Sequence, residues 1–345
     1  MRVIVAMSGG VDSSVAAALL QQQGHDVVGV TMRLWGGESD SGCCSVSDVD
    51  DARRVADQLD LDHHVFNFGE DFERHVVAPY VADHVAGRTP NPCIECNRHL
   101  KFDALLARAA TLGFDAVATG HHARVVTRPD GTFRVGRGAD RAKDQSYVLH
   151  MLDQPTLART LFPLGDRTKA DVRALAAELG LRTATKPDSQ DVCFITSTEG
   201  RATFLGRRVA LTPGRVVDEA GTEVGQVPAI ELVTIGQRRG LDAPGGGPPR
   251  YAVSVDAATS TVTVGGPEAL LTDVQAAVDP VWADRPGLGA ALVQCSAHGT
   301  SEPAIVEPDG TGLVVRWQQP HRRIAAGQSL VFYDDDEVLG GATAC

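Results

Sequence analysis

Short apolar runs alternate with helix-forming stretches through the first 200 residues. Runs rich in β-branched residues have the pattern of strands buried on both faces, and they lie at 3–6, 27–32, 64–68 and 116–119. Stretches with helix formers or helically spaced apolar residues lie at 15–24, 46–59, 102–112 and 169–179. Thr168 and Asp171 have the spacing of a capping box at the start of the last stretch. Repeated β-α units of this kind predict a doubly wound parallel sheet.

The pattern changes after about residue 200. Helical periods vanish, and short β runs are separated by Pro/Gly turns such as Pro213-Gly214, 244–249 and 265–267. We therefore expect an α/β domain followed by a small central β domain and a C-terminal β barrel. The expected domain ranges are 1–200, 201–270 and 271–345.

Composition narrows the class of protein. The chain has 345 residues, of which 43% are hydrophobic and 22% charged, as is ordinary for a globular protein of two or three domains. No apolar run approaches the roughly 20 residues that cross a bilayer, so we expect a cytoplasmic protein without membrane contact. Seven cysteines in such a chain favour thiol chemistry or metal binding over a disulfide scaffold.

The charge of the chain does not decide whether its partner is a nucleic acid. A net charge of −12 argues against nucleic acid as a partner. Basic residues nevertheless gather locally, and such clusters bind phosphates even on acidic proteins. They lie at 134–143 and in the pairs 207–208, 238–239 and 322–323.

The segment Met7–Ser14 joins the first expected strand to the first expected helix. A strand, a Ser/Gly turn and a helix point backbone N–H groups at an anion, and adjacent glycines let the main chain approach the ligand. Asp12 fits beside a phosphate when Mg²⁺ lies between them. No Gly-Lys-Ser/Thr follows, so this is not a Walker loop. Ser-Gly-Gly-Val-Asp-Ser instead resembles the pyrophosphate loop (PP-loop) of the N-type ATP pyrophosphatases. The alternative is an ordinary strand-to-helix turn.

In a doubly wound sheet, ligands bind beyond the carboxyl ends of the strands. Met32 ends the second expected strand and Gly120 follows the fourth, at the same edge where the PP-loop follows the first. This convergence predicts one nucleotide pocket.

Asn91–Asn97 contains a Cys-x-x-Cys motif at Cys93 and Cys96. Such a pair fits a redox couple, half of a metal site or two buried thiols. A zinc site needs a second pair at similar spacing, and the adjacent Cys43-Cys44 chelates poorly. In a catalytic interpretation the partner sulfur is Cys193, which follows a polar run: a sulfur nucleophile attacks an activated carbon and a second cysteine resolves the product as a disulfide.

A set of motifs in fixed order makes a resemblance specific. The PP-loop is followed by Thr-Pro-Asn-Pro at 89–92, Cys-Asn at 96–97, Lys-Phe at 101–102, Gly-His at 120–121, Lys-Asp-Gln-Ser-Tyr at 143–147, the run 186–195 and Thr-Ile-Gly-Gln-Arg-Arg-Gly-Leu at 234–241. Together they resemble the tRNA-specific 2-thiouridylases from residue 3 to Gly327-Gln328. That family has a PP-loop α/β domain, a small central β domain and a C-terminal β barrel.

The resemblance implies an ATP-dependent tRNA sulfurtransferase. ATP with Mg²⁺ is expected at a loop comprising Ala6, Met7, Ser8, Gly9, Gly10, Val11, Asp12 and Ser13, together with Met32 and Gly120. The 2-oxygen of the wobble uridine of lysine, glutamate and glutamine tRNAs is adenylated, with release of pyrophosphate and later AMP. Cys193 carries a persulfide from a cysteine desulfurase or a sulfur-relay protein. Cys96 is the second catalytic cysteine, a nucleophile that closes an alternate Cys96–Cys193 disulfide.

The resemblance also implies contacts with the substrate RNA. The target base is expected at Asn91, Pro92 and Cys93, and the tRNA at His121, Lys143, Asp144, Gln145 and Gln328. Cys93 stands where many members have Asp, and His122 where Tyr is common. The segment 294–299 lacks the positive charge of the family's C-terminal tRNA contact.

Two other functions compete with this one. The first is a PP-loop ligase that adenylates a small molecule. The second is a thiol-based metal or redox-sensing module that retains a nucleotide fold.

Overall fold

The computed structural model describes residues 1–34, 46–188, 192–195, 200–241 and 248–345. The N-terminal domain is built on a parallel sheet with the strand order β3-β2-β1-β4-β7. From β1 the chain proceeds outward through β2 and β3, and then returns to place β4 and β7 on the other side. The order of the strands therefore reverses between β1 and β4, and the predicted doubly wound sheet is confirmed. The strands are β1 (Arg2–Ala6), β2 (Asp26–Arg33), β3 (His63–Asn67), β4 (Ala116–Ala118) and β7 (Thr160–Leu161).

Helices cover both faces of this sheet, because alternate residues of β1 point to opposite sides. Val3 and Val5 pack in one apolar cluster, whereas Ile4 packs in another. The first layer comprises α1 (Val11–Gln22), α2 (Val46–Gln58) and α8 (Lys169–Glu178). The second comprises α3 (Gly69–Phe72), η1 (Glu73–Val77), α4 (Ala78–Val85), α5 (Pro92–Glu95), η2 (Cys96–Ala104) and α6 (Leu105–Thr111).

The helices depart from the sequence prediction in three places. The helix expected at 102–112 begins ten residues earlier, at Pro92, and passes through a π-helical stretch, η2, before α6. The helix expected from residue 15 begins at Val11, directly behind the glycines. A short helix, α9 (Gly200–Gly206), forms where no helix was expected, because Phe204 and Leu205 pack into the second apolar cluster of the N-terminal domain.

A small sheet with the order β10-β11-β8-β9 follows. Its core is made of short aliphatic side chains, with Val216, Val262 and Val264 fully buried. The elements are β8 (Gly214–Asp218), β9 (Glu223–Val227), η4 (Ile230–Leu232), β10 (Tyr251–Asp256), β11 (Thr261–Gly265) and η5 (Pro267–Leu270). This is the predicted central β domain.

The C-terminal strands form a closed barrel. The order β12-β15-β14-β13-β16-β17 is completed by a further pairing between β12 and β17. Closure removes free strand edges, as predicted for this part of the chain. The strands are β12 (Leu271–Trp282), β13 (Gly289–Gln294), β14 (Ser301–Asp309), β15 (Gly312–Arg322), β16 (Ser329–Asp334) and β17 (Glu337–Ala344).

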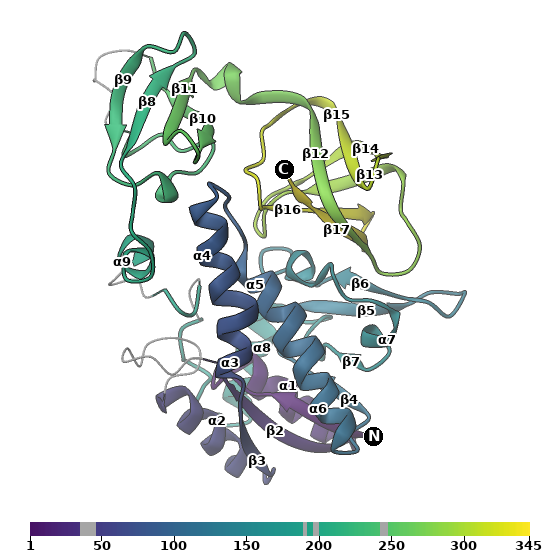
Figure 1. Ribbon diagram of the computed structural model, residues 1–345. Helices are drawn as coiled ribbons and strands as arrows, with labels where there is room; N and C mark the ends of the chain where they lie inside the picture. Colours follow the sequence, from purple (N-terminus) through teal and green to yellow (C-terminus); the bar gives the residue numbers. More distant parts are fainter. Residues whose placement is uncertain (35–45, 189–191, 196–199, 242–247) are drawn as a thin grey trace.

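A hairpin of the N-terminal domain extends this barrel sheet. Strands β5 (Ala123–Thr127) and β6 (Phe133–Arg137) pair with each other, and Gly136 of β6 pairs with Glu337 of β17. In Figure 1 the hairpin lies directly beneath β17. Tyr147 of η3 (Ser146–Leu149) packs with Tyr333 of β16 in the same cluster, and α7 (Gln154–Leu157) also contributes to it. The two domains thus share a hydrophobic core, which the sequence pattern did not predict.

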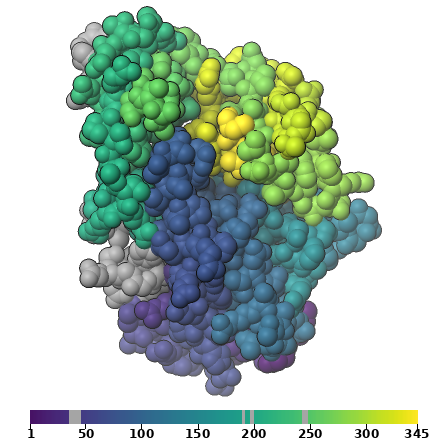
Figure 2. Space-filling view, viewed as in Figure 1, coloured from purple at the N-terminus to yellow at the C-terminus, as the bar shows by residue number. Residues whose placement is uncertain are grey.

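The two β domains lie on the same side of the N-terminal domain. Figure 2 shows the blue segment that contains α4 between the green central domain and the yellow-green barrel. His84 of α4 bonds the backbone carbonyl oxygen of Glu231 in the central domain through Nδ1, at 3.1 Å. Within the described residues, no helix is long and apolar enough to cross a bilayer.

Candidate active site

The PP-loop closes the carboxyl end of β1 and starts α1. Gly9 has a φ of +70°, and a Cβ atom there would lie 2.2 Å from the carbonyl oxygen of Asp48, so only glycine fits. Ser13 Oγ accepts a hydrogen bond from the Ser8 N–H at 3.2 Å, which folds the loop back on the helix. Gly10 is the N-cap of α1, and its lack of a side chain leaves the first turn without a side-chain cap. The backbone N–H groups at the start of α1 therefore suit an anionic ligand.

Gly120 brings the end of β4 against this loop. A Cβ atom on Gly120 would lie 2.7 Å from the backbone nitrogen of Ser13 and 2.8 Å from the carbonyl carbon of Asp12. The PP-loop and Gly120 therefore meet where the strand order reverses, which is where doubly wound sheets bind ligands. Met32 lies at the end of β2 and is buried in the second apolar cluster.

Asp12 lies in the first turn of α1, and the side-chain nitrogens of Lys169 and His122 lie beside its carboxylate. Lys169 Nζ, at the start of α8, donates to Asp12 Oδ1 at 2.8 Å and to Oδ2 at 2.7 Å. His122 Nε2 lies 3.3 Å from Asp12 Oδ1. Burial raises the pKa of Asp12, but the bonds from His122 and Lys169 outweigh it and hold the pKa below its ordinary value. Asp12 is thus a carboxylate at neutral pH.

Lys169 also reaches a second carboxylate. Its Nζ lies 2.9 Å from Asp188 Oδ1, and Asp188 further accepts bonds from Lys143 at 2.8 Å and Arg173 at 2.7 Å. Burial raises the pKa of Asp188, but the bonds from Lys143 and Lys169 dominate and lower it well below the ordinary value. The two carboxylates, Asp12 and Asp188, are therefore joined through one ammonium group.

Lys186 supports the loop from the other side. Its Nζ donates to the carbonyl oxygen of Gly9 at 3.0 Å and to carboxylate oxygens of Asp48 and Asp51, both at 2.7 Å. Burial lowers the pKa of Lys186, but its bonds to Asp48 and Asp51 outweigh it and leave the pKa raised. Lys186 stays charged and ties the PP-loop to the segment that leads to Cys193.

Sequence reasoning missed the roles of Lys169 and Lys186. One signal was available for Lys169, because a cation in the first turn of a helix opposes the helix dipole and needs an anion nearby. Its backbone N–H donates to Asp140, and the predicted capping box of Thr168 and Asp171 is present, so the helix start is well fixed.

The Asn-Pro-Cys segment starts α5. The Asn91 side chain caps the helix by accepting a bond from the Cys93 N–H at 3.1 Å. Pro92 occupies the first turn, where a backbone N–H has no partner within the helix, so the missing N–H of proline costs no hydrogen bond. Cys93 is exposed, whereas Cys96 at the start of η2 is buried. Asn97, the next residue, donates to the carbonyl oxygen of Val148 at 2.9 Å.

Cys193 belongs to the same apolar cluster as Cys96. Its neighbour Phe194 anchors it there, because that ring packs edge-on against Phe72 and Tyr80 at centroid distances of 5.6 and 5.4 Å. Two sulfurs 97 positions apart in the sequence are thus brought into one cluster on one face of the sheet. The predicted disulfide between them stays a prediction.

The residues predicted to contact tRNA lie in different environments. His121 is buried beside Phe102 and Phe162, with its Nδ1 2.6 Å from Thr119 Oγ1. Burial, followed by the charges of Lys101 and His122, lowers the pKa of His121 well below its ordinary value.

Asp144 and Gln145 are occupied within the protein. Asp144 accepts bonds from Arg137, the Gly138 N–H and Ser146, and Gln145 Oε1 accepts from the His122 N–H at 2.9 Å. These residues shape the joint between the β5–β6 hairpin and the PP-loop, and Lys143 beside them is exposed. The predicted tRNA contacts stay predictions.

Gln328 bridges the barrel and the N-terminal domain. Its side-chain amide donates to the carbonyl oxygen of Thr89, whose N–H donates to Ala326 at 2.7 Å. Thr89 Oγ1 also donates to Thr234 Oγ1 in the central domain at 3.3 Å. All three domains therefore meet two residues before Asn91.

Two further features of the sequence analysis are the Cys43-Cys44 pair and the segment 294–299. Cys43 and Cys44 lie outside the described residues. Gln294, which opens the segment without positive charge, is buried and donates to the carbonyl oxygen of Ser296 at 2.8 Å.

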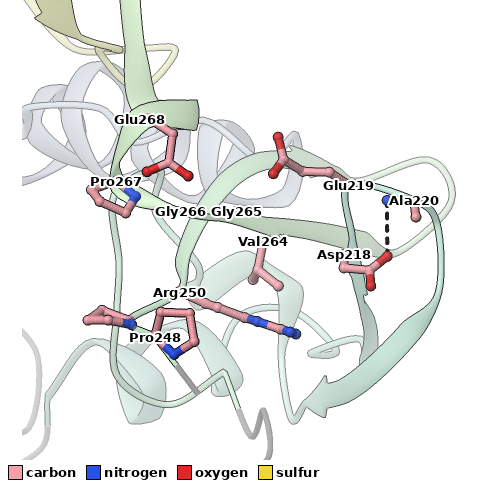
Figure 3. Close-up of a pocket in the computed structure, with 11 residues that line it drawn as sticks. Asp218, Glu219, Ala220, Pro248, Arg250, Val264, Gly265, Gly266, Pro267 and Glu268 are labelled. Atoms are coloured by element: carbon pink, nitrogen blue, oxygen red, sulfur yellow. Dashed lines mark hydrogen bonds between the residues drawn. The ribbon is translucent and has the colours of Figure 1, made fainter.

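A cavity of about 340 Å³ lies in the central domain, far along the chain from the PP-loop. Figure 3 shows the carboxylates of Asp218, Glu219 and Glu268 around it, with Arg250 as the cation among its lining residues. Three carboxylates repel phosphate groups, so this cavity does not suit a nucleotide.

The PP-loop site does suit one. It offers helix N–H groups and serine hydroxyls to phosphates, and the Asp12 carboxylate is the ligand type that Mg²⁺ prefers. Asp12, with the hydroxyls of Ser8 and Ser13 nearby, would hold the metal, which would draw charge from the phosphates during their transfer.

Comparison with known proteins agrees with this class of fold. Family models match residues 1–197 (tRNA methyl transferase HUP domain), 202–266 (tRNA methyl transferase PRC-barrel domain) and 276–344 (Aminomethyltransferase beta-barrel domain). The fold and the site thus define a HUP-domain enzyme with two appended β domains.

Curated relatives specify the family. The chain is 46% identical to the tRNA-specific 2-thiouridylase MnmA of Roseiflexus sp. (strain RS-1) over 368 residues, covering 99% of this chain and 98% of the relative. It is 47% identical to the enzyme of the same name from Mycobacterium sp. (strain JLS) over 358 residues, again covering 99% and 98%. The chain belongs to the tRNA-specific 2-thiouridylase family.

Proposed function

We propose that this protein catalyses ATP-dependent 2-thiolation of the wobble uridine of tRNA, with lysine, glutamate and glutamine tRNAs as the expected substrates. The observation that carries the proposal is the clustering of Cys96 and Cys193 in the domain that bears the PP-loop. A PP-loop alone supports adenylation of any acceptor, whereas two gathered cysteines suit sulfur transfer. We expect the reaction in the cytoplasm, where tRNA and ATP are both present.

The first step activates the base. The start of α1 would receive the triphosphate, and Asp12, whose lowered pKa keeps its carboxylate ionised, would hold Mg²⁺. The uracil 2-oxygen attacks the α-phosphorus, the α–β phosphoanhydride bond breaks, and pyrophosphate leaves. The product carries AMP on the former carbonyl oxygen, so that C2 now has a good leaving group.

The second step transfers sulfur. A cysteine desulfurase or a relay protein loads Cys193 as a persulfide, whose terminal sulfur attacks C2 and expels AMP. The Cys96 thiolate then attacks the Cys193 sulfur, which breaks the S–S bond, forms the Cys96–Cys193 disulfide and leaves sulfur on the base. A reductant returns the two thiols.

Mass spectrometry of tRNA nucleosides tests the proposal. Unmodified tRNA is incubated with the protein, ATP, Mg²⁺, a cysteine desulfurase and cysteine, and 2-thiouridine is expected to appear. Cys193→Ser should abolish it while ATP binding persists, whereas Cys345→Ser, at an exposed position on the barrel, should retain it. Thiolation by Cys193→Ser would overturn the sulfur-transfer assignment.

The same assay shows which of Cys93 and Cys96 acts as the nucleophile. Cys96→Ser should abolish turnover, because the mixed disulfide cannot be resolved. Cys93→Ser should remain active, because Cys93 is exposed outside the cluster. The reverse result would assign the nucleophile to Cys93.

Pyrophosphate release tests the activation step. Asp12→Ala removes the metal ligand and should abolish release. In the wild type, release should depend on added tRNA. Release that is independent of tRNA but stimulated by a small acceptor would instead support an adenylating ligase.

A further inference from the structure

The basic groups along the chain differ in how their charges are used. Arginines of the cluster 134–143 and of the pair 207–208 form ion pairs with carboxylates of the protein. The pairs Arg238-Arg239 and Arg322-Arg323 are exposed. Within the described residues, no carboxylate forms an ion pair with any of these four guanidinium groups. Their charge is therefore available to a partner.

The fold brings the two exposed pairs to one place. Arg322 ends β15 of the barrel, and its guanidinium group lies over the ring of Tyr251 in β10, 5.7 Å from the ring centroid. The N–H of Ala252, the next residue of β10, donates to the carbonyl oxygen of Gln237 at 2.9 Å. Gln237 directly precedes Arg238, so the start of β10 adjoins both pairs. Arg238, Arg239, Arg322 and Arg323 thus form one surface across the central domain and the barrel, here called the junction surface.

Hydrogen bonds fix the backbone that carries these arginines. The Arg323 N–H donates to the carbonyl oxygen of Leu270 at 2.7 Å, which ties the end of the barrel strand to η5. In the central domain, Gln237 Oε1 accepts from the Thr234 N–H at 3.1 Å, and Gln237 Nε2 donates to the carbonyl oxygen of Arg239 at 2.8 Å. A fixed backbone reduces the entropy that is lost when side chains order around a ligand.

The junction surface begins close to the segment expected to contact the target base. Thr234 Oγ1 accepts a bond from Thr89 Oγ1 at 3.3 Å, and Thr89 lies two residues before Asn91. Arg238 lies four residues after Thr234, and four residues span at most about 14 Å even when extended. An RNA whose base lies at Asn91 would therefore have its neighbouring backbone within reach of these arginines.

The chemistry of the junction surface fits phosphate groups. Arginine presents a planar fork of N–H donors that bonds phosphate oxygens in a bidentate manner. The chain as a whole carries a net charge of −12, so a polyanion approaches it favourably only where positive charge gathers. On the barrel, the segment 294–299 contains no lysine or arginine, whereas Arg322 and Arg323 are adjacent and exposed.

We propose that the junction surface binds the sugar-phosphate backbone of tRNA and orients the molecule while its wobble base occupies the site at Asn91. Contacts of this kind position an RNA without reading its sequence. The inference rests on the proposed function, because it takes tRNA as the substrate.

Filter binding of end-labelled, unmodified tRNA measures these contacts without turnover. The dissociation constant is determined without ATP at about 50 to 200 mM KCl, because each phosphate contact adds about 0.7–0.9 to the slope of log Kd against log [KCl]. Arg238→Gln/Arg239→Gln and Arg322→Gln/Arg323→Gln should each lower this slope by about 1.4–1.8. At fixed salt, each double variant should weaken binding by about 3- to 30-fold. The variant with all four substitutions should lower the slope by about 3.

A double variant elsewhere on the surface is the matched control. Arg208→Gln/Arg316→Gln removes the same charge, but Arg208 pairs with Glu73 at 2.6 Å and Arg316 with Glu307 at 2.7 Å. It should keep the wild-type slope. In the thiolation assay, the junction variants should raise KM for tRNA and leave kcat and the dissociation constant of ATP unchanged.

The proposal is overturned if either junction double variant keeps the wild-type slope, or if the control loses as much slope as they do. If a double variant does not fold, the single variants Arg239→Gln and Arg323→Gln replace it, and each should lower the slope by about 0.7–0.9.

Two further results separate this proposal from others. Unchanged tRNA binding with slower loading of Cys193 by the desulfurase would assign the surface to a protein partner and overturn the proposal. Unchanged binding with normal 2-thiouridine formation refutes this inference alone. Loss of slope in the variants, when the wild type forms no 2-thiouridine, refutes the proposed function alone.

Discussion

Substitution of Gly120 by alanine tests how closely the end of β4 packs on the PP-loop. The new Cβ atom would lie 2.7 Å from the Ser13 nitrogen, whereas ordinary contact begins at 3.4 Å, so about 0.7 Å of movement is needed. The opposing atoms are backbone of the first turn of α1 and cannot rotate away. Overpacking of this kind costs about 1–3 kcal/mol. If the cost falls on the nucleotide site, ATP affinity falls by roughly 5- to 150-fold.

Titration calorimetry with ATP and Mg²⁺ gives this affinity directly. Gly206→Ala is the matched control, because a Cβ atom there meets only the Leu211 side chain at 3.5 Å. The control should bind ATP as the wild type does. An unchanged dissociation constant for Gly120→Ala, with an unchanged melting temperature, would refute the close approach of the two segments.

Three further predictions concern the supports of the site. Lys186→Met removes the ammonium group that bonds the Gly9 carbonyl oxygen and bridges it to Asp48 and Asp51, so ATP binding measured by calorimetry should weaken, and Lys186→Arg should retain more of it. Thr168→Ala removes the hydroxyl that caps α8 by accepting from the Asp171 N–H. It should lower the free energy of unfolding by about 1 kcal/mol in denaturant titrations, whereas Thr168→Ser should not. Because the folded pKa of Asp188 lies below the ordinary value of 3.8, its ion pairs stabilise the protein fully above that pH and are lost as pH falls through the folded value. Asp188→Asn should therefore destabilise at pH 7, with a difference that shrinks below about pH 4; a difference that grows in acid would contradict the sign of the shift.

The parts of the fold that could be predicted from sequence are local. The strand, loop and helix around Asp12 lie within about 20 residues, so periodicity and glycine placement indicate them directly. The capping box at Thr168 is equally local. The meeting of Gly120 with the loop followed from a general property of doubly wound sheets.

Contacts between distant segments were not predictable in the same way. Nothing in the sequence around Gly136 indicates that it pairs with Glu337, because strand pairing over that distance leaves no local period. The basic cluster at 134–143 was open to a phosphate-binding interpretation. In the structure Arg137 pairs with Asp144 and Arg141 with Asp336, so that part of the cluster joins the hairpin to the barrel.

The residues of the candidate site also divide into those that a local motif indicates and those that only contacts between distant segments indicate. Motifs in the sequence predict Asp12, Cys96 and Cys193 as site residues, but no motif indicates Lys169 or Lys186, because their partners come from other segments. An ion-pair chain becomes visible only when the segments are placed in space.

The pairing of β6 with β17 also affects how the protein folds while it is being synthesised. Residue 136 leaves the ribosome about 200 residues before its partner at 337, which is about 10–40 s at translation rates of 5–20 residues per second. The β5–β6 hairpin itself closes in about 1–10 μs. Its outer strand must therefore wait, unpaired on one edge, for millions of times longer than it takes to form, and during that interval the nascent chain offers a template for wrong pairing.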